Sequence, residues 1–152
     1  MSPTPREVFL KLVHGVCEER WEEVVELYAE KTHVEHPLHP PALRSREEVR
    51  AHFGIGAPPG VHGGHTLRRQ PTDIAVHETA DPEVIVAEFR YEGTVVETRE
   101  PFSYPAIFVM RVLTGGGQGS PTLSRARSCW CQSERSQGGG SSTPASPAGA
   151  EN

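Results

Sequence analysis

The chain has 152 residues, a net charge of −5 and a hydrophobic share of 36%, which suits one ordinary domain and is short for two. The acidic balance argues against nucleic acid or an anionic membrane as a partner, and no apolar run approaches the roughly 20 residues that span a bilayer. The three cysteines, Cys17, Cys129 and Cys131, make no disulfide framework. We therefore predict a cytoplasmic protein.

The N-terminal residues predict two amphipathic helices. Thr4-Pro-Arg-Glu7 has the residues of a capping box, with proline at the first helical position. Apolar residues then recur at three- and four-residue spacing, namely Val8, Phe9, Leu12, Val13, Val16 and Cys17. A second helix is expected over residues 20–29, with its glutamates in water. Neither helix can bury its apolar stripe alone, so a sheet or further helices must cover both.

A short strand is predicted next, over residues 32–36. Side chains alternate along a strand, so Val34 and His36 share one face while His33 and Glu35 share the other. Pro37 ends the strand, because it has no amide hydrogen for a sheet ladder. We predict that the face with His36 points into an internal cavity. A third helix is then expected from the capping box Ser45-Arg-Glu-Glu48 to Gly54.

From residue 65 the hydrophobic period changes from that of a helix to two, which predicts strands. We expect them over residues 66–77, 83–95 and 102–112, with Phe89, Tyr91, Phe108 and Met110 facing inward. Pro105 predicts a bulge in the last of these strands. Both faces of that strand are apolar, so both are expected to be covered.

The composition changes again at the C-terminus. Residues 114–152 are dominated by Gly, Ser, Pro and Ala, and they carry too little apolar surface to offset an ordering entropy of roughly 1–2 kcal/mol per residue. We therefore predict a folded domain over residues 1–113 and a disordered tail over 114–152. Two thiols in Ser128-Cys-Trp-Cys131, without further ligands, fall short of a zinc site.

Three motifs carry a resemblance to a known family. Trp21-x-x-Val-Val-x-Leu-Tyr-Ala29, Thr32-His-Val-Glu-His-Pro37 and Arg46-Glu-Glu-Val-Arg-Ala-His-Phe53 resemble the nuclear-transport-factor-2-like superfamily, and within it the SnoaL-like, polyketide-cyclase-like branch. The resemblance covers about residues 3–112. It implies an α+β fold: a cone-shaped α+β barrel, with three N-terminal helices on a curved, mostly antiparallel sheet and a pocket inside. The superfamily includes isomerases, cyclases, epoxide hydrolases, dehydratases and non-catalytic binders, so the fold does not choose the function.

Two departures from the family pattern bear on function. Ketosteroid isomerases of this fold have an aspartate general base where this chain has His36, and their two oxyanion donors match Leu12 and Phe108. An enolate would lack both donors, so the resemblance argues against steroid isomerisation. Gly115-Gly-Gly also replaces the family's usual turn into a final strand. Our hypothesis is that the C-terminus is divergent or frameshifted and that this strand is missing, which would leave an open edge.

The candidate catalytic residues are His36, Tyr91 and Tyr104. An imidazole has an unperturbed pKa of about 6.5, which suits His36 to proton transfer at neutral pH, and the tyrosines would orient it or bind a substrate oxygen. The alternatives are a histidine that only lines the pocket and tyrosines that only form an aromatic wall. The rest of the expected pocket wall is Leu12, Val16, Phe53, Phe89, Phe108 and Met110. These side chains are simply a core if the cone is filled.

Neither a metal nor a cofactor is predicted. His33, His36 and His39 have the spacing H-x-x-H-x-x-H, but the first two point to opposite faces of a strand and no carboxylate or cysteine completes a ligand set. Glu35 and Glu88 fall on the face away from the cavity.

The leading hypothesis is a domain that binds a hydrophobic small molecule, with His36 as the proton-transfer group of a cofactor-independent isomerase, cyclase or lyase. The alternative is a non-catalytic ligand-binding or dimerisation module, a homodimer through Val84, Val86, Ile107 and Val109. An inactive paralogue is the third reading. A cavity of roughly 300 Å³ that His36 reaches favours chemistry, whereas a filled cone with an exposed sheet favours assembly.

Overall fold

The computed structural model describes residues 3–36, 41–55, 67–114 and 121–130 of the chain. The helices within these ranges are α1 (Pro5–Cys17), α2 (Trp21–Glu26) and α3 (Arg46–His52). The strands are β1 (Tyr28–Glu35), β2 (Leu43–Ser45), β3 (Leu67–Glu78), β4 (Val84–Val95), β5 (Pro101–Leu113) and β6 (Thr122–Trp130). The predicted α+β class, with three N-terminal helices against a sheet, is confirmed.

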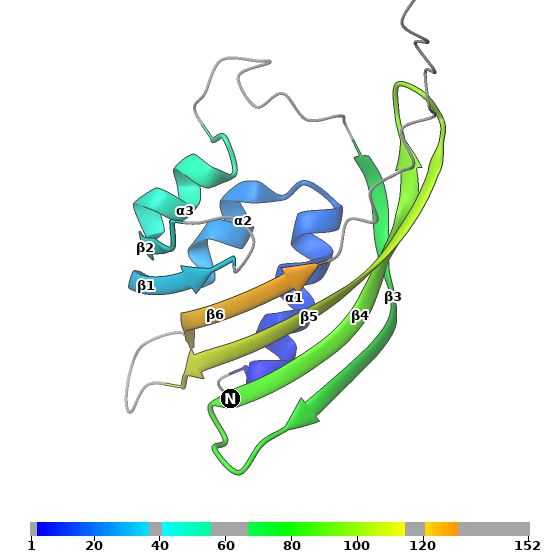
Figure 1. Ribbon diagram of the computed structural model, residues 1–152. Coiled ribbons are helices and arrows are strands. Elements are labelled where there is room, and N and C mark those ends of the chain that lie inside the picture. The colour runs from blue at the N-terminus through cyan, green and yellow to red at the C-terminus, as the bar shows by residue number, and fades with distance from the viewer. Residues whose placement is uncertain (1–2, 37–40, 56–66, 115–120, 131–152) are drawn as a thin grey trace, which may run out of the picture.

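One curved sheet holds all six described strands, in the order β2-β1-β6-β5-β4-β3. Neighbouring strands are antiparallel except β1 and β6, which are parallel. The sheet bends around the three helices, which lie on its concave side (Figure 1). It does not close on itself, because β2 and β3 remain as its two edge strands. The described helices bury their apolar faces against the concave side of this sheet.

Local signals in the sequence set the helix ends. The Thr4 side chain accepts a hydrogen bond from the amide of Glu7 at 3.3 Å, and the Glu7 carboxylate accepts one from the amide of Thr4 at 2.6 Å, as in a capping box. The Ser45 side chain caps α3 by accepting from the amide of Glu48, but the Glu48 carboxylate accepts from the amide of Arg44, so the predicted capping box is only half formed. The second helix is shorter than predicted. It stops at Glu26 because the following residues pair with β6, so tertiary pairing overrides helical propensity there.

The core lies between α1 and the middle of the sheet. The apolar stripe of α1 is almost completely buried, and Phe9 at its centre packs edge-on against Phe89 and Phe108, with ring centroids 5.5 and 6.2 Å apart. Gly15 faces α2, where an added Cβ would lie 2.6 Å from a methyl group of Val24. The glycine, a poor helix former, is explained by this close approach of the two helices.

The predicted bulge at Pro105 is wrong. The β4–β5 pairing runs without a shift from Val84 opposite Arg111 to Thr94 opposite Pro101. The β5–β6 pairing begins at Ala106, so Pro105 lies beyond its end, where a missing amide hydrogen removes no bond to β6. Register shifts occur elsewhere: in β3, where Asp73 has a positive φ of 52°, and in the β5–β6 pairing between Arg111 and Val112.

The prediction of a missing final strand, with disorder from residue 114 onward, is wrong for β6. This strand lies in the middle of the sheet, between β1 and β5, and so covers the edge that was expected to be open. Leu123, Ala126 and Ser128 of β6 are at most 5% exposed. Two of these inward-facing residues are small, so they give only a weak strand pattern, and a Gly- and Ser-rich context conceals it. Residues 115–120 and 131–152 lie outside the described ranges.

The convex face of the sheet is the less covered one. Ile107 and Val109 of β5 are each 40% exposed, so the expectation that both faces of this strand are covered is wrong for the single chain.

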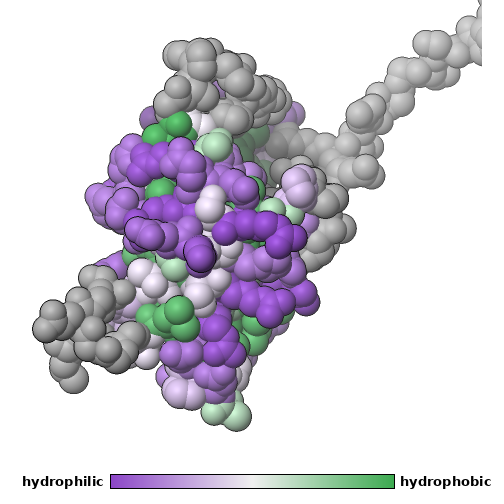
Figure 2. Space-filling view, turned by 90° about the vertical axis from the view of Figure 1, so that its left-hand side faces the viewer, coloured by the Kyte–Doolittle hydropathy of each residue, from purple (hydrophilic) through white to green (hydrophobic). Residues whose placement is uncertain are grey.

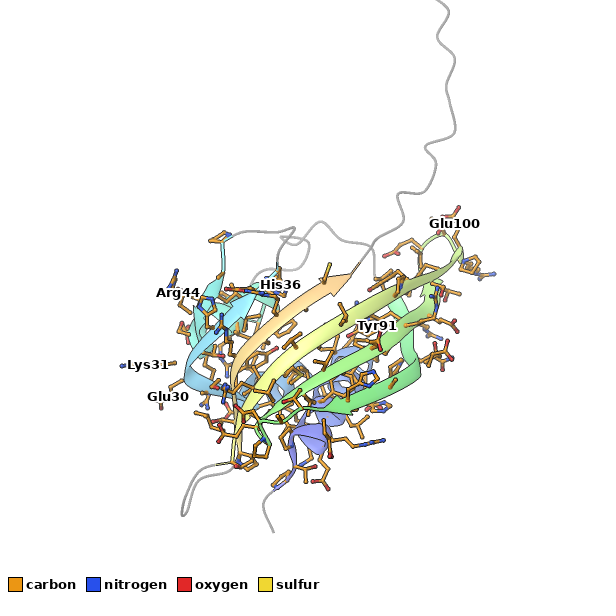
Figure 3. The ribbon with its side chains drawn as sticks, turned by 60° about the horizontal axis from the view of Figure 1, so that its bottom comes forward. Glu30, Lys31, His36, Arg44, Tyr91 and Glu100 are labelled. Atoms are coloured by element: carbon orange, nitrogen blue, oxygen red, sulfur yellow. The ribbon has the colours of Figure 1, made fainter. Side chains whose placement is uncertain are left out.

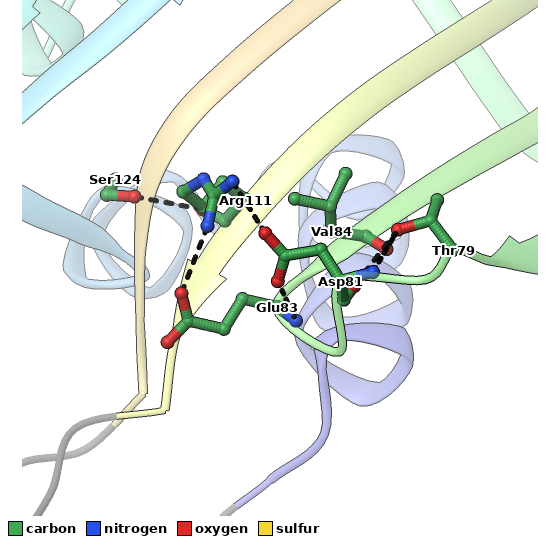
Figure 4. A network of polar contacts seen from close by, with 6 residues as sticks. All are labelled: Thr79, Asp81, Glu83, Val84, Arg111 and Ser124. Atoms are coloured by element: carbon green, nitrogen blue, oxygen red, sulfur yellow. Dashed lines mark hydrogen bonds and ion pairs between the residues drawn. The ribbon is translucent and has the colours of Figure 1, made fainter.

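Polar contacts connect the β3–β4 turn to β5 on the convex side of the sheet (Figure 4). Arg111 donates to Asp81 at 2.7 Å and to Glu83 at 3.1 Å. The backbone amide of Glu83, and then the Arg111 guanidinium, hold the pKa of Asp81 below its usual value.

Substitution of Leu123 tests whether β6 is part of the core. We expect Leu123→Ala to lower the free energy of unfolding by about 2–5 kcal/mol, because it opens a cavity under a fully buried side chain. The matched control Leu113→Ala, at a position that is 41% exposed, should cost less than about 1 kcal/mol. Urea denaturation measures both. Equal and small effects would contradict a core position for β6.

Candidate functional site

A cavity of about 260 Å³ lies on the concave side of the sheet. All three helices and every strand of the sheet contribute to its lining, which is mostly apolar and aromatic. The polar groups in the lining are His36, His52, Ser128, Arg69 and the tyrosine hydroxyls. Among the described residues, no Asp or Glu lines it. The chemistry available in the cavity is therefore that of imidazole, hydroxyl, phenol and guanidinium groups.

The structure brings together most of the residues that the sequence suggested. His36, Tyr91 and Tyr104 line the cavity, as do Leu12, Val16, Phe53 and Phe108 of the expected apolar wall. Phe89 and Met110 do not. Phe89 lies in the core behind the wall, edge-on against Tyr91 with ring centroids 4.9 Å apart, and Met110 is fully buried. Both face inward as the alternation predicted, but α1 packs over this part of the sheet and fills the space.

His36 follows the last residue of β1, beside a strand that the sequence did not reveal (Figure 3). Because β1 and β6 run parallel with Glu35 opposite Arg127, the next residues along the strands, His36 and Ser128, also meet. The Nδ1 atom of His36 is 2.8 Å from the hydroxyl oxygen of Ser128, which is 4% exposed. The His36 ring also stacks on that of His52, with centroids 5.2 Å apart. These contacts hold the imidazole in one orientation.

The other face of β1 carries a separate polar cluster. The Nε2 atom of His33 is 2.7 Å from the Glu35 carboxylate, which also accepts a hydrogen bond from Arg127 at 2.6 Å. Hydrogen bonds from His33 and Arg127 hold the pKa of Glu35 below its usual value. Glu88 likewise lies outside the cavity, 2.8 Å from His77. The predicted division of the strand faces is thus correct: His33 and Glu35 lie on one side, Val34 and His36 on the other.

A second polar group of the cavity comes from three neighbouring strands. Tyr91 of β4 and Tyr104 of β5 are cross-strand partners with ring centroids 5.5 Å apart, and the guanidinium carbon of Arg69 in β3 lies 5.5 Å from the centre of the Tyr91 ring. Burial raises the pKa of both tyrosines, and Arg69 opposes that shift. Both phenols are therefore neutral at physiological pH and can donate a hydrogen bond.

Sequence reasoning missed Arg69 and Ser128. Arg69 shares the less exposed face of β3 with Leu67 and Pro71, and an arginine in this series of positions could have indicated a role in the cavity. Gly93 of β4 lies opposite Arg69, and a Cβ added to it would collide with the Arg68 carbonyl. The two strands can come this close because position 93 is a glycine. For Ser128, the only sequence signal was the weak alternation of apolar residues along β6.

The described residues contain no group of three His, Cys, Asp or Glu side chains that could hold a metal ion. His52 stacks on His36 as described, and Trp21 stacks on Phe53 with centroids 5.1 Å apart.

In the part of the chain that the structure covers, no helix has both the length and the apolar character needed to cross a membrane. The face on the β1–β2 side is largely hydrophilic, with hydrophobic residues in small separate patches (Figure 2).

Comparison with known proteins places the fold. Residues 9–117 match the family model described as SnoaL-like domain. The chain belongs to the SnoaL-like domain family. Among curated proteins, none is significantly similar in sequence.

Solved structures of the same fold share little sequence with this SnoaL-like protein. A Bacillus subtilis protein provisionally assigned as an isomerase has a TM-score of 0.67 and 21% identity, over 84% of this chain and 86% of that one. The epoxide hydrolase/cyclase-like enzyme SalBIII, of pyran ring formation in the polyether salinomycin, has a TM-score of 0.61 and 16% identity, over 84% and 91%. RV0760c from Mycobacterium tuberculosis, solved in complex with estradiol-17beta-hemisuccinate, has a TM-score of 0.58 and 15% identity, over 83% and 93%.

Two buried acidic groups, the phenol of Tyr91 in the cavity lining and the thiol of Cys17 in α1, predict a loss of stability at alkaline pH. Burial raises the pKa of Tyr91 and raises that of Cys17 to about 11, whereas both groups ionise earlier in the unfolded chain. Their contribution to stability is therefore complete below the unfolded pKa values and falls as pH rises above them. We expect the urea midpoint to drop between about pH 8 and pH 10.5.

The Tyr91→Phe variant serves as the control for this prediction, since it removes one of the ionising groups and keeps the ring. Its urea midpoint should decline less steeply over the same pH range than that of the wild type. A wild-type midpoint that does not change, or an identical slope in the variant, would contradict the buried position of the Tyr91 hydroxyl.

Proposed function

We propose that this SnoaL-like domain binds an apolar small molecule in the cavity and that His36 transfers a proton to or from it, without a cofactor, in an isomerase, cyclase or lyase reaction in the cytosol. The observation that carries the proposal is the His36 imidazole, fixed by Ser128 in the wall of an otherwise apolar cavity. A volume of about 260 Å³ is close to the lower end, roughly 300 Å³, of ordinary ligand sites.

The contact with Ser128 suits proton transfer by His36. A serine hydroxyl can either accept a hydrogen bond from Nδ1–H or donate one to an unprotonated Nδ1. It can therefore accompany a change in the protonation of the ring without leaving a buried group unsatisfied. In this proposal Nδ1 stays with Ser128, and Nε2 takes a proton from carbon or returns one to the intermediate.

The polar tyrosines give the proposed site a second function, which is to bind a ligand oxygen. Leu12 and Phe108, at the positions of the oxyanion donors in ketosteroid isomerases, contribute only apolar surface to the lining. Tyr104 is half-buried, and burial raises the pKa of its hydroxyl, so it would act as a neutral donor. Such a donor, together with the absence of both usual ones, favours a reaction other than steroid isomerisation.

The known structures of this fold support a small-molecule role in general terms. One is provisionally assigned as an isomerase, one is a cyclase-like enzyme of pyran ring formation, and one was solved with a steroid ester. Apolar ligands and ring-forming chemistry therefore fit the proposed site. In this proposal the structure of the bound substrate decides whether proton transfer by His36 leads to isomerisation, cyclisation or elimination.

Exchange of hydrogen for deuterium tests His36 on simple carbon acids, whatever the natural substrate is. A panel of aryl ketones, β-keto esters and polycyclic phenols is incubated with the protein in D₂O, and mass spectrometry measures deuterium incorporation. We expect His36→Asn to lower the exchange rate of the best substrate at least about a hundredfold, as loss of a general base does. His33→Asn is the matched control, because His33 lies on the opposite face of the same strand. An unchanged rate in His36→Asn would remove His36 from the mechanism.

A second candidate function is assembly. The convex sheet face exposes Ile107 and Val109, each 40%, beside Val84 and Val86 on the neighbouring strand. A groove of about 310 Å³ on this face is bordered by Arg111, Arg125 and Arg127. Apolar residues with a charged border are typical of protein interfaces. This face would pack against a second copy of the chain, as a dimerisation module with or without catalysis.

Sedimentation velocity tests the assembly proposal. We expect the wild type to sediment as a dimer and Val109→Asp to sediment as a monomer, because a carboxylate placed in an apolar interface would be desolvated. Val96→Asp is the matched control. Val96 has a similar exposure, 43%, but lies beyond the end of β4, so this variant should remain dimeric. A monomeric wild type would refute the proposal.

A further inference from the structure

Arg69 differs from the other partly buried arginines of the chain. Each of those forms an ion pair with a carboxylate: Arg46 with Glu26, Arg50 with Glu22, Arg90 with Glu92, and Arg111 with Asp81. Among the described residues, no Asp or Glu lies within ion-pair distance of Arg69, whose contacts are the face of Tyr91 and the hydroxyl of Tyr104. A partly buried cation is thus held in place by groups that do not neutralise its charge.

The cavity concentrates the effect of this charge. Arg69 is part of the lining, the described lining has no acidic residue, and most of the surrounding surface is apolar. A guanidinium group in such surroundings loses hydration without gaining a counter-ion. Its attraction for an anion is also stronger than it would be in water, because the local dielectric constant is lower. The arrangement therefore favours a negatively charged group as the partner of Arg69.

We infer that the ligand of this cavity is an apolar molecule with one carboxylate group, and that Arg69 binds this group with Tyr104 as a second donor. The inference rests on the proposed function, and it names the class of ligand. The planar fork of the guanidinium suits a carboxylate in particular. One anionic group is expected rather than two, because Arg69 is the only Lys or Arg of the described lining.

The topology separates this group from the proposed proton-transfer residue. Arg69 is on β3, at one edge of the sheet, whereas His36 follows β1, and three strands lie between them. A ligand anchored by its anionic group at Arg69 would extend its apolar body along the aromatic wall toward His36. Arg69 is then a residue that determines specificity and position, and it does not take part in the proton transfer itself.

Binding of two matched probes tests the inference. Naphthalene carboxylate and naphthalene carboxamide have almost the same shape and differ in charge. Isothermal titration calorimetry is used to compare their affinities for the wild type, for Arg69→Gln and for the control Arg68→Gln. Arg68 is the preceding residue and is exposed, so the control removes the same charge outside the cavity. Circular dichroism at increasing temperature shows which variants are folded.

We expect the wild type and Arg68→Gln to bind the carboxylate at least about tenfold more tightly than the carboxamide, as a charge-assisted hydrogen bond predicts. Arg69→Gln should bind both probes equally and should keep the wild-type affinity for the carboxamide. Equal binding of the two probes by the wild type, or an undiminished preference in Arg69→Gln, would overturn the inference and leave the proposed apolar site intact. Failure of the wild type to bind either probe would count against both.

Discussion

The pairing of β6 with β1 on one side and β5 on the other is the constraint on which the rest of this structure depends. It joins the short strands next to the helices to the long antiparallel strands, so that one curved, open sheet packs against the helices. It also buries Leu123 in the core and sets Ser128 against His36. Without this strand, β1 and β5 would each expose an unpaired edge, and the imidazole would lose the contact that orients it.

The composition of the cavity follows from this arrangement. Side chains from the concave face of the strands meet the apolar stripes of the helices and leave a space of about 260 Å³ in which polar groups are few. Those few occur in two places, His36 with Ser128 and His52 on one side and Arg69 with two tyrosines on the other. The His36 imidazole contacts Ser128 and His52, and the Arg69 guanidinium contacts Tyr91 and Tyr104. An imidazole ring and a guanidinium group, separated by apolar surface, form a site suited to a mostly apolar ligand with a defined orientation.

The sequence predicted those features that depend on local chemistry or simple periodicity. The capping residues Thr4 and Ser45, the inward positions of Tyr91 and Phe108, and the placement of His36 opposite to His33 all follow from rules that act over a few residues. Features that depend on distant parts of the chain were missed. β6 is short of large apolar residues and is preceded by a glycine-rich segment, so only its pairing with two other strands makes it a strand. Ser128 could not be linked to His36 without it.

The role of Arg69 was missed for a different reason. In sequence, an arginine on a strand is normally solvent-facing, and only the three-dimensional arrangement shows that no described carboxylate accompanies it. For Phe89 and Met110, the sequence predicted the inward direction correctly but not the place in the cavity wall. The packing of Phe9 against the sheet places Phe89 in the core, and Met110 is buried away from the cavity. Alternation predicts which face a side chain lies on, but not whether that part of the face is filled or hollow.

Native-state hydrogen exchange of the backbone amides, read by NMR, tests the central claim most directly. If β6 is an interior strand that positions Ser128 at His36, amides of residues 123–129 that bond to β1 or β5 exchange as slowly as those at the centre of β5. Exchange of those amides at the rate of an unstructured peptide, while β4 and β5 remain protected, would contradict the account.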